Sequence, residues 1–132
     1  MARWLLDANI ISAAMRDAYG PLAGRLRATG RGDLCTSVVA AAELRFGASR
    51  KGSARLEAAV EAVLSTLDVA PLETPADRIY GALRARLQAC GESLGANDVW
   101  IAAHAMTLDC VLVTDDRAFE RVEGLKVENW LR

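Results

Sequence analysis

Short apolar runs alternate with longer stretches of helical periodicity along this chain. The runs are Trp4–Leu6, Leu34–Thr36, Leu67–Ala70 and Cys110–Val113, with a weaker one at Leu125–Val127. Runs of this length predict buried strands, and strands that alternate with helices are typical of βαβ units. The pattern therefore predicts an α/β fold, with a mostly parallel central sheet of four to five strands flanked by helices.

Between these runs, apolar residues recur every three or four positions, which is typical of the core-facing side of a helix. The stripes comprise Leu56, Val60, Val63 and Leu67, then Ile79, Leu83 and Leu87, then Ile101, Ala105 and Leu108. Pro75 suits the start of the second helix and Gly91 its end. No linker or repeat interrupts the pattern, so we expect one domain over residues 1–132.

Charge is distributed unevenly over the 132 residues, although the formal net charge is only −1. Residues 1–55 hold nine Arg or Lys and four Asp or Glu, whereas residues 56–132 hold seven and thirteen. The basic residues are mostly arginine, whose planar fork binds phosphate oxygens well. Either contact with a nucleic-acid backbone or genomic base composition explains this bias. The candidates for backbone contact are Arg25, Arg27, Arg31, Arg45, Arg50 and Arg55, of which we favour Arg25, Arg27, Arg45 and Arg50.

Several classes of protein are disfavoured. No stretch approaches the roughly 18 uninterrupted apolar residues of a membrane span, and Asp7 interrupts the first apolar run before a signal-peptide core forms. We therefore expect a soluble, cytoplasmic protein. No phosphate-binding loop of the G-x-x-x-x-G-K-[ST] type occurs.

Cysteine and histidine do not form a recognisable site. The three cysteines, Cys35, Cys90 and Cys110, are too far apart to form a C-x-x-C motif. We expect all three to be reduced core residues. The single histidine, His104, lies mid-helix, which argues against a zinc site and against a histidine-activated nucleophile.

Four acidic residues stand where predicted elements end or begin. Asp7 follows the first apolar run and Asp116 the fourth, Glu43 lies about two turns into a helix expected from Ser37, and Asp98 lies in a first helical turn. The carboxyl ends of parallel strands meet at one edge of a sheet, which is where open α/β folds place their ligands. Four carboxylates there would repel one another unless cations neutralised them, and the expected cations are Mg²⁺ or Mn²⁺.

Each acid also has a structural explanation. Asp7 equally suits a helix cap, and a lone glutamate such as Glu43 is usually solvated. The small residues 40–42 favour an inward Glu43, because they let the helix approach the sheet. The helix N-terminus favours negative charge at Asp98 and should lower its tendency to protonate.

Asp115 and Asp116 cannot both point at one site, because consecutive side chains diverge. We favour Asp116 inward, with Asp115 as a cap or turn residue. The chemistry that such an array suits is phosphodiester hydrolysis, in which two cations about 3.5–4 Å apart activate a water and stabilise the leaving oxygen.

Four segments of this chain resemble PIN-domain ribonucleases, and within them the VapC toxins of bacterial toxin–antitoxin pairs. The segments are LLDANIIS at 5–12, AAELRFG at 41–47, ANDVWIAAHA at 96–105 and VLVTDDRAFERVEGLKVENW at 111–130. Their order and spacing match the family over nearly the whole chain.

The resemblance implies that Asp7, Glu43 and Asp98 surround a Mg²⁺ or Mn²⁺ ion, with Asp116 completing the acidic set and Asn9 and Thr114 orienting it. It also implies RNA cleavage by metal-activated water, commonly in a structured RNA such as a tRNA anticodon loop. A homodimer and a cognate VapB-like antitoxin are further implications. Whether Asp115 or Asp116 is the fourth acid, and whether one or two metals bind, stays open.

Two other functions compete with this interpretation. In a phosphatase of the haloacid dehalogenase type, Asp7 would be the nucleophile and Ser37 would follow the second strand, but the second Asp of that chemistry is replaced by Asn9. The other alternative is a non-catalytic module that keeps the PIN fold and acts by association, which the presence of all four acids disfavours.

Overall fold

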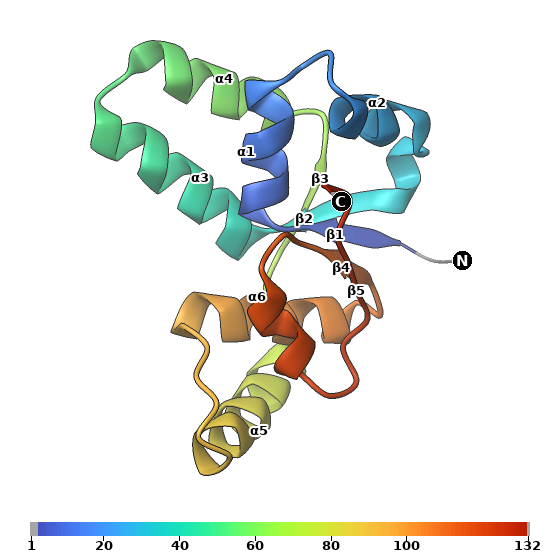
Figure 1. Cartoon of the computed structure of the whole chain (residues 1–132). Coiled ribbons are helices and arrows are strands. Elements are labelled where there is room, and N and C mark those ends of the chain that lie inside the picture. The colour runs from blue at the N-terminus through green and yellow to red at the C-terminus, as the bar shows by residue number, and fades with distance from the viewer. Residues whose placement is uncertain (1–2, 132) are drawn as a thin grey trace.

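A parallel five-stranded sheet forms the centre of the structure, a computed structural model that describes residues 3–131 (Figure 1). The strands lie in the order β3-β2-β1-β4-β5, and every neighbouring pair is parallel. They comprise β1 (Trp4–Leu6), β2 (Leu34–Ser37), β3 (Asp68–Ala70), β4 (Val111–Val113) and β5 (Val127–Glu128). The predicted α/β fold and parallel sheet are confirmed.

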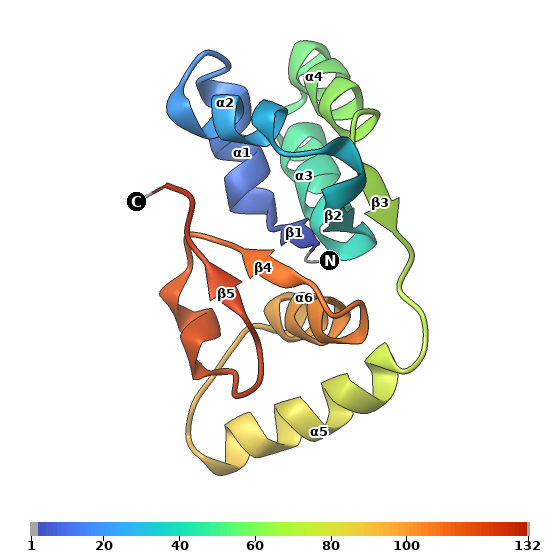
Figure 2. The same cartoon turned by 90° about the vertical axis from the view of Figure 1, so that its right-hand side faces the viewer.

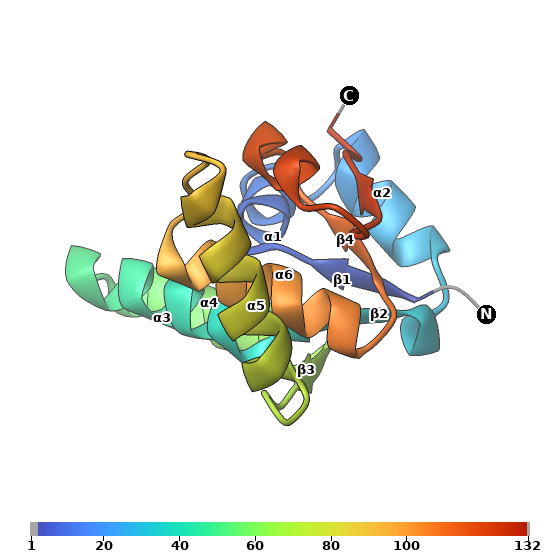
Figure 3. The ribbon, with the colours of Figure 1, turned by 90° about the horizontal axis from the view of Figure 1, so that it is seen from below.

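Helices cover both faces of this sheet (Figures 2 and 3). Helices α1 to α4 pack on one face, and α5 and α6 pack on the other. The bounds are α1 (Ala8–Arg16), α2 (Pro21–Ala28), α3 (Val38–Lys51), α4 (Ala54–Leu64), α5 (Ala76–Ala89) and α6 (Ala96–Thr107), with 3-10 helices at Arg31–Asp33 and Arg117–Arg121. No helix among the described residues has the length and apolar character needed to cross a bilayer.

Alternation along β1 divides the core into two layers. Leu5 packs toward α5 and α6 with Ile101 and Phe119, whereas Leu6 packs toward α1 to α4 with Ile11 and Leu44. Successive side chains of a strand point to opposite faces, so a strand buried on both sides reads as a continuous apolar run. This explains why the runs in the sequence located the strands.

Three expectations about individual residues are wrong. Leu67 and Leu108 lie beyond the ends of α4 and α6, although they continue the apolar periodicity of those helices. Cys90 is exposed at the end of α5, whereas Cys35 and Cys110 are buried with their Sγ atoms 3.9 Å apart. The periodicity of an apolar stripe does not report where the backbone leaves the helix, so helix ends are poorly predicted from it.

The order of the strands places a topological switch beside β1. The chain adds β2 and then β3 on one side of β1, and returns to add β4 and β5 on the other. In register, Leu6 pairs with Thr36 and with Val113. Open α/β sheets bind ligands beyond the carboxyl ends of their strands at such a switch, so the residues that follow these positions define the place to look for a site.

Candidate active site

Asp7 occupies the switch point and serves two structural roles. It follows β1 and caps α1, with Oδ1 accepting a hydrogen bond from the Ala8 backbone N–H at 2.8 Å. Its Oδ2 accepts the Thr114 hydroxyl at 2.8 Å, and the side chain is only 5% exposed. Burial raises the pKa of Asp7, the hydrogen bonds from Thr114 and Ala8 oppose this, and the charge of Asp116 adds to it. The cap therefore uses one carboxylate oxygen and leaves the other facing β4.

A hydrogen-bond network around Asp7 joins the ends of β1 and β4. The side-chain amide of Asn9 donates to Asp7 Oδ2 and to Thr114 Oγ1, each at 3.3 Å. The backbone N–H of Asp115 donates to Asn9 Oδ1 at 3.2 Å, and that of Asp116 to Thr114 Oγ1 at 3.1 Å. Thr114 is buried, so its hydroxyl is held in place. Asn9 and Thr114 thus orient the Asp7 carboxylate and the turn after β4.

The two acids of that turn differ in their partners. Asp116 caps the 3-10 helix Arg117–Arg121, accepting the Ala118 N–H at 2.9 Å, and its charge acts on Asp7 and Asp98. Asp115 accepts from the Asn129 side chain at 2.8 Å. The capping residue is therefore Asp116, whereas the sequence analysis assigned a cap or turn role to Asp115. Asp116 nevertheless lies within electrostatic range of the other acids.

Glu43 reaches the same edge from α3. Ala40 and Ala41 are fully buried and let α3 approach the sheet, as expected, whereas Ala42 is exposed. Ser37 caps α3 by accepting the Val39 N–H, which fixes where the helix begins. Glu43 Oε1 is buried without a hydrogen-bond partner among the described residues. An orphaned buried carboxylate oxygen is costly, and it fits a site where a cation binds.

Asp98 stands in the first turn of α6, behind the N-cap residue Gly95. Burial raises its pKa to about 6, and the charges of Asp7 and Asp116 add to the shift. The expected lowering by the helix N-terminus is wrong, because burial and the neighbouring carboxylates outweigh it. In the same way, burial followed by the charges of Asp7 and Asp98 raises the pKa of Glu43 to about 7.

These four residues, Asp7, Glu43, Asp98 and Asp116, are called the acidic cluster below. Among the described residues, no three acidic, histidine or cysteine side chains already converge as a closed metal-ligand set. Their oxygen chemistry nevertheless suits Mg²⁺ or Mn²⁺, and a cation would relieve the repulsion that adds to the effect of burial on the pKa values of Asp7, Glu43 and Asp98. The residues present therefore fit a hard divalent cation.

His104 is part of the buried core and contacts Ser37, the residue that caps α3. Its Nδ1 lies 2.7 Å from Ser37 Oγ, and both side chains are buried. Burial lowers the pKa of His104, and the carbonyl of Pro71 acts in the opposite direction. Ser37 is thus occupied by His104 and by the cap of α3, so it is not available as the phosphate-binding serine of a phosphatase.

The structure places the four favoured arginines in different surroundings. Arg25 stacks over Trp130 at 4.0 Å and lies 3.8 Å from Glu128, and Arg27 donates to the Ala18 carbonyl at 2.9 Å. Arg45 forms two hydrogen bonds of 2.9 Å with Glu61. Arg50 alone of the four lines the groove next to the acidic cluster.

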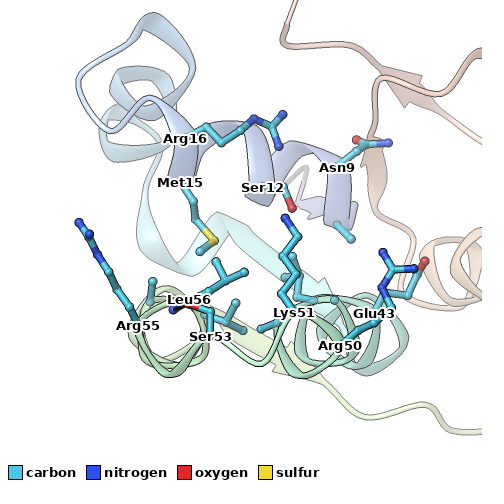
Figure 4. Close-up of a pocket in the computed structure, with 16 residues that line it drawn as sticks. Asn9, Ser12, Met15, Arg16, Glu43, Arg50, Lys51, Ser53, Arg55 and Leu56 are labelled. Atoms are coloured by element: carbon cyan, nitrogen blue, oxygen red, sulfur yellow. Dashed lines mark hydrogen bonds between the residues drawn. The ribbon is translucent and has the colours of Figure 1, made fainter.

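That groove lies between α1, α3 and α4 and has a volume of about 780 Å³ (Figure 4). Asn9, Ser12 and Arg16 line it from α1, and Glu43, Gly47 and Arg50 line it from α3. Two further basic residues, Lys51 and Arg55, also line it. Sequence reasoning missed Ser12, Arg16 and Lys51. A signal for Ser12 and Arg16 was present, because both recur at helical spacing with Asn9.

Comparison with known proteins identifies the class to which this fold and site belong. Residues 4–125 match the PIN domain family, so this chain is a PIN domain protein. The chain is 32% identical to ribonuclease VapC2 of Haemophilus influenzae, over 99% of its own length and all of that protein. It is 33% identical to the tRNA(fMet)-specific endonuclease VapC of Shigella flexneri, over 98% and 99% of the two chains. Within the PIN domain family, the chain belongs with the VapC ribonucleases, as the resemblance of its four segments predicted.

Solved structures agree with this assignment. VapBC2 from Rickettsia felis, bound to a promoter DNA fragment, aligns with a TM-score of 0.90 at 28% identity, covering 96% of this chain and 98% of that one. DNA-bound VapBC from Salmonella typhimurium aligns with a TM-score of 0.90 at 31% identity, covering 98% and 99%. The similarity therefore extends over the whole fold and is not confined to the acidic residues.

Proposed function

We propose that this chain is a metal-dependent endoribonuclease that hydrolyses RNA phosphodiester bonds. The observation that carries the proposal is that Asp7, Glu43 and Asp98 lie within electrostatic range of one another at the switch point of the sheet, where burial and neighbouring carboxylates raise all three pKa values. Groups with strongly shifted pKa values in a cleft are candidates for function. VapC relatives named as ribonucleases share the full length of the fold.

Asp7, Glu43 and Asp98 would hold Mg²⁺ or Mn²⁺, with Asp116 adding charge or a second metal position. When bound, such a cation would polarise the phosphate and lower the pKa of a water, so that the water can lose a proton and attack the phosphorus. Thr114 and Asn9 fix the rotamer of Asp7, so this carboxylate need not change its conformation to bind the cation. Glu43 and Asp98 supply the charge that faces it. In the proposed reaction water attacks the phosphorus and the 3′ oxygen leaves, which gives a 5′-phosphate and a 3′-hydroxyl without a covalent intermediate.

The substrate class proposed is a structured RNA with an accessible loop, such as a tRNA anticodon loop. Two of the similar proteins are named as tRNA(fMet)-specific endonucleases. Cleavage of such an RNA would inhibit translation, and the cytoplasm is the compartment where this substrate occurs.

A cognate VapB-like antitoxin is the proposed inhibitor, because the similar structures are VapBC complexes. A second, more apolar groove of about 670 Å³ between α1, α2 and α4 suits one face of an amphipathic partner helix. Its lining includes Ile11, Leu26 and Val63. A homodimer is also proposed, since α3 exposes Val38 and Phe46, the latter 65% exposed.

The test is cleavage of total cellular RNA by antitoxin-free protein, with the new ends mapped by sequencing. Reactions contain Mg²⁺, Mn²⁺ or a chelator, and use wild type, Asp98→Asn and Asp77→Asn. Asp77 is a matched control, because it too stands in a first helical turn, that of α5 on the far face. We expect discrete metal-dependent cuts with wild type and Asp77→Asn, and none with Asp98→Asn.

Two results would contradict the proposal. Cuts by folded Asp98→Asn at the wild-type rate would remove Asp98 from the site. The absence of cuts from folded wild type that binds metal would favour the non-catalytic module, which acts by association.

A further inference from the structure

The groove between α1, α3 and α4 has ends of opposite charge. Asn9 and Glu43 lie at the end next to the acidic cluster, and Glu43 is the only acidic residue among the described residues that line the groove. Arg16, Arg50, Lys51 and Arg55 form the basic wall along the rest. Figure 4 shows Arg16 on α1 facing Lys51 on α3 across the groove. A ligand that fills the groove would therefore meet cations along its length and carboxylates at one end.

These four cations are not committed to carboxylates of this chain. Arg45 pairs with Glu61, Arg25 with Glu128 and Arg86 with Glu123. Among the residues that the structure describes, Arg16, Lys51 and Arg55 have no carboxylate within salt-bridge distance, and Arg50 contacts only the ring of Phe46 at 5.7 Å. Four like charges around one groove repel one another. Their placement stabilises an anionic ligand rather than the fold.

The acidic cluster does not pair with these cations. Among the described residues, none of its members forms a salt bridge with Arg16, Arg50, Lys51 or Arg55. The charges that act on Glu43 are those of Asp7 and Asp98, and they raise its pKa. The basic wall therefore acts on a ligand that spans the groove.

The floor of the groove leaves room for such a ligand. Met15, Leu44 and Leu56 supply apolar surface, and Gly47 lies between Glu43 and the basic wall. A Cβ atom added at Gly47 would have no neighbour within 4 Å, so the space above α3 is open there. A volume of about 780 Å³ is within the range of small-molecule sites. It suits a short length of one strand.

We propose that this groove is the track along which single-stranded RNA reaches the acidic cluster, with Arg16, Arg50, Lys51 and Arg55 binding its phosphates and Gly47 keeping the path open. The inference rests on the proposed ribonuclease function and names the residues that deliver its substrate. Phosphate contacts position a nucleic acid without reading its sequence, so the track supplies register and affinity.

The first test measures binding without cleavage. In the Asp98→Asn background, fluorescence anisotropy with a short, labelled single-stranded oligoribonucleotide is recorded over a series of salt concentrations, and the RNA is checked on a gel afterwards. Each phosphate contact to a single strand contributes about 0.7 to the slope of log K against log salt. We expect Arg50→Gln/Lys51→Gln to reduce that slope by about 1.4. Arg78→Gln/Arg86→Gln removes the same charge from α5 and should leave the slope unchanged.

The second test blocks the path and keeps every charge. Gly47→Leu should lower the affinity for the oligoribonucleotide at least tenfold and leave the melting temperature equal or higher, because leucine favours a helix over glycine. Gly81→Leu on α5 is the matched control, since a Cβ atom there also has no neighbour within 4 Å. We expect Gly81→Leu to bind RNA as the parent protein does.

Unchanged slope and affinity in both groove variants would overturn the proposal, as would a parent protein whose binding does not depend on salt. Poly-L-glutamate serves as a probe for an acidic protein segment. If the groove variants lose binding to poly-L-glutamate but keep RNA binding, the basic wall would instead bind an acidic segment of a protein partner. These outcomes are distinct from failure of the proposed function, because that function is judged by metal-dependent cleavage by the wild-type chain.

Discussion

The hydroxyl of Thr114 donates to Asp7 Oδ2 at 2.8 Å and so links the turn after β4 to the end of β1. The same oxygen of Thr114 accepts hydrogen bonds from the Asn9 side chain and the Asp116 backbone. One buried hydroxyl therefore positions two members of the acidic cluster. Groups that orient a metal-binding carboxylate commonly change affinity or activity by about 10- to 100-fold when lost.

Thr114→Val tests this link, because valine keeps the shape and removes the hydroxyl. We expect RNA cleavage to fall by about 10- to 100-fold and the free energy of unfolding to fall by about 1–3 kcal/mol, since the Asp116 N–H loses its acceptor. Thr114→Ser keeps the hydroxyl, so it should retain most of the RNA cleavage and most of the free energy of unfolding. Cleavage rates and chemical denaturation measure the two effects, and full activity of Thr114→Val would show that Asp7 needs no support from β4.

Asp116→Asn removes the charge of this residue but keeps a side-chain oxygen that can cap the 3-10 helix Arg117–Arg121. Asparagine caps helices as well as aspartate does, so stability should be retained, whereas cleavage should fall by about 10-fold or more. Asp115→Asn keeps the side-chain oxygen that accepts from Asn129 and should have little effect. Steady-state cleavage of one labelled RNA ranks the two variants. The reverse ranking would make Asp115 the fourth acid.

The pH dependence of stability should reveal the strain in the acidic cluster. Glu43 and Asp98 have pKa values raised to about 7 and about 6, above their usual values. The folded state therefore binds these protons more tightly than the unfolded state, so metal-free stability falls as pH rises from about 4 to about 7. Glu43→Gln should match wild type near pH 4 and melt at a higher temperature near pH 8.

Differential scanning fluorimetry in chelator measures this difference. Addition of Mg²⁺ or Mn²⁺ at about pH 8 should raise the melting temperature of wild type more than that of Glu43→Gln, because ligands that bind the folded state stabilise it. A wild type that is more stable than Glu43→Gln at alkaline pH without metal would contradict the assignment.

His104 should prove structural. Its ring is buried against Ser37, so His104→Ala removes the partner of that hydroxyl and should lower the free energy of unfolding by about 1–3 kcal/mol. His104→Asn keeps an acceptor near the position of Nδ1 and should recover part of the loss. Both variants should cleave RNA at the wild-type rate per folded molecule. A specific loss of cleavage in folded His104→Asn would give this residue a role in the chemistry.

The sequence predicted the features that local pattern encodes. Strands buried on both faces appear as apolar runs, and the parallel order of those strands placed Asp7, Asp98 and Asp116 at one edge. The pattern did not reveal α2, which is short, contains Gly24 and carries two arginines. It also did not distinguish arginines that face the groove from those that pair elsewhere. The partner of Arg45 is Glu61, sixteen residues away on another helix, and nothing near Arg45 in the sequence indicates it.

The order of the strands makes the acidic cluster depend on segments that are far apart in the sequence. β4 lies next to β1 in the sheet, yet α1 to α6, β2 and β3 separate the two along the chain. A chain that ended after α6 would lack β4, one of the two neighbours of β1, and with it the hydroxyl of Thr114 and the charge of Asp116. A product truncated after α6 would therefore lack part of the acidic cluster and should not cleave RNA.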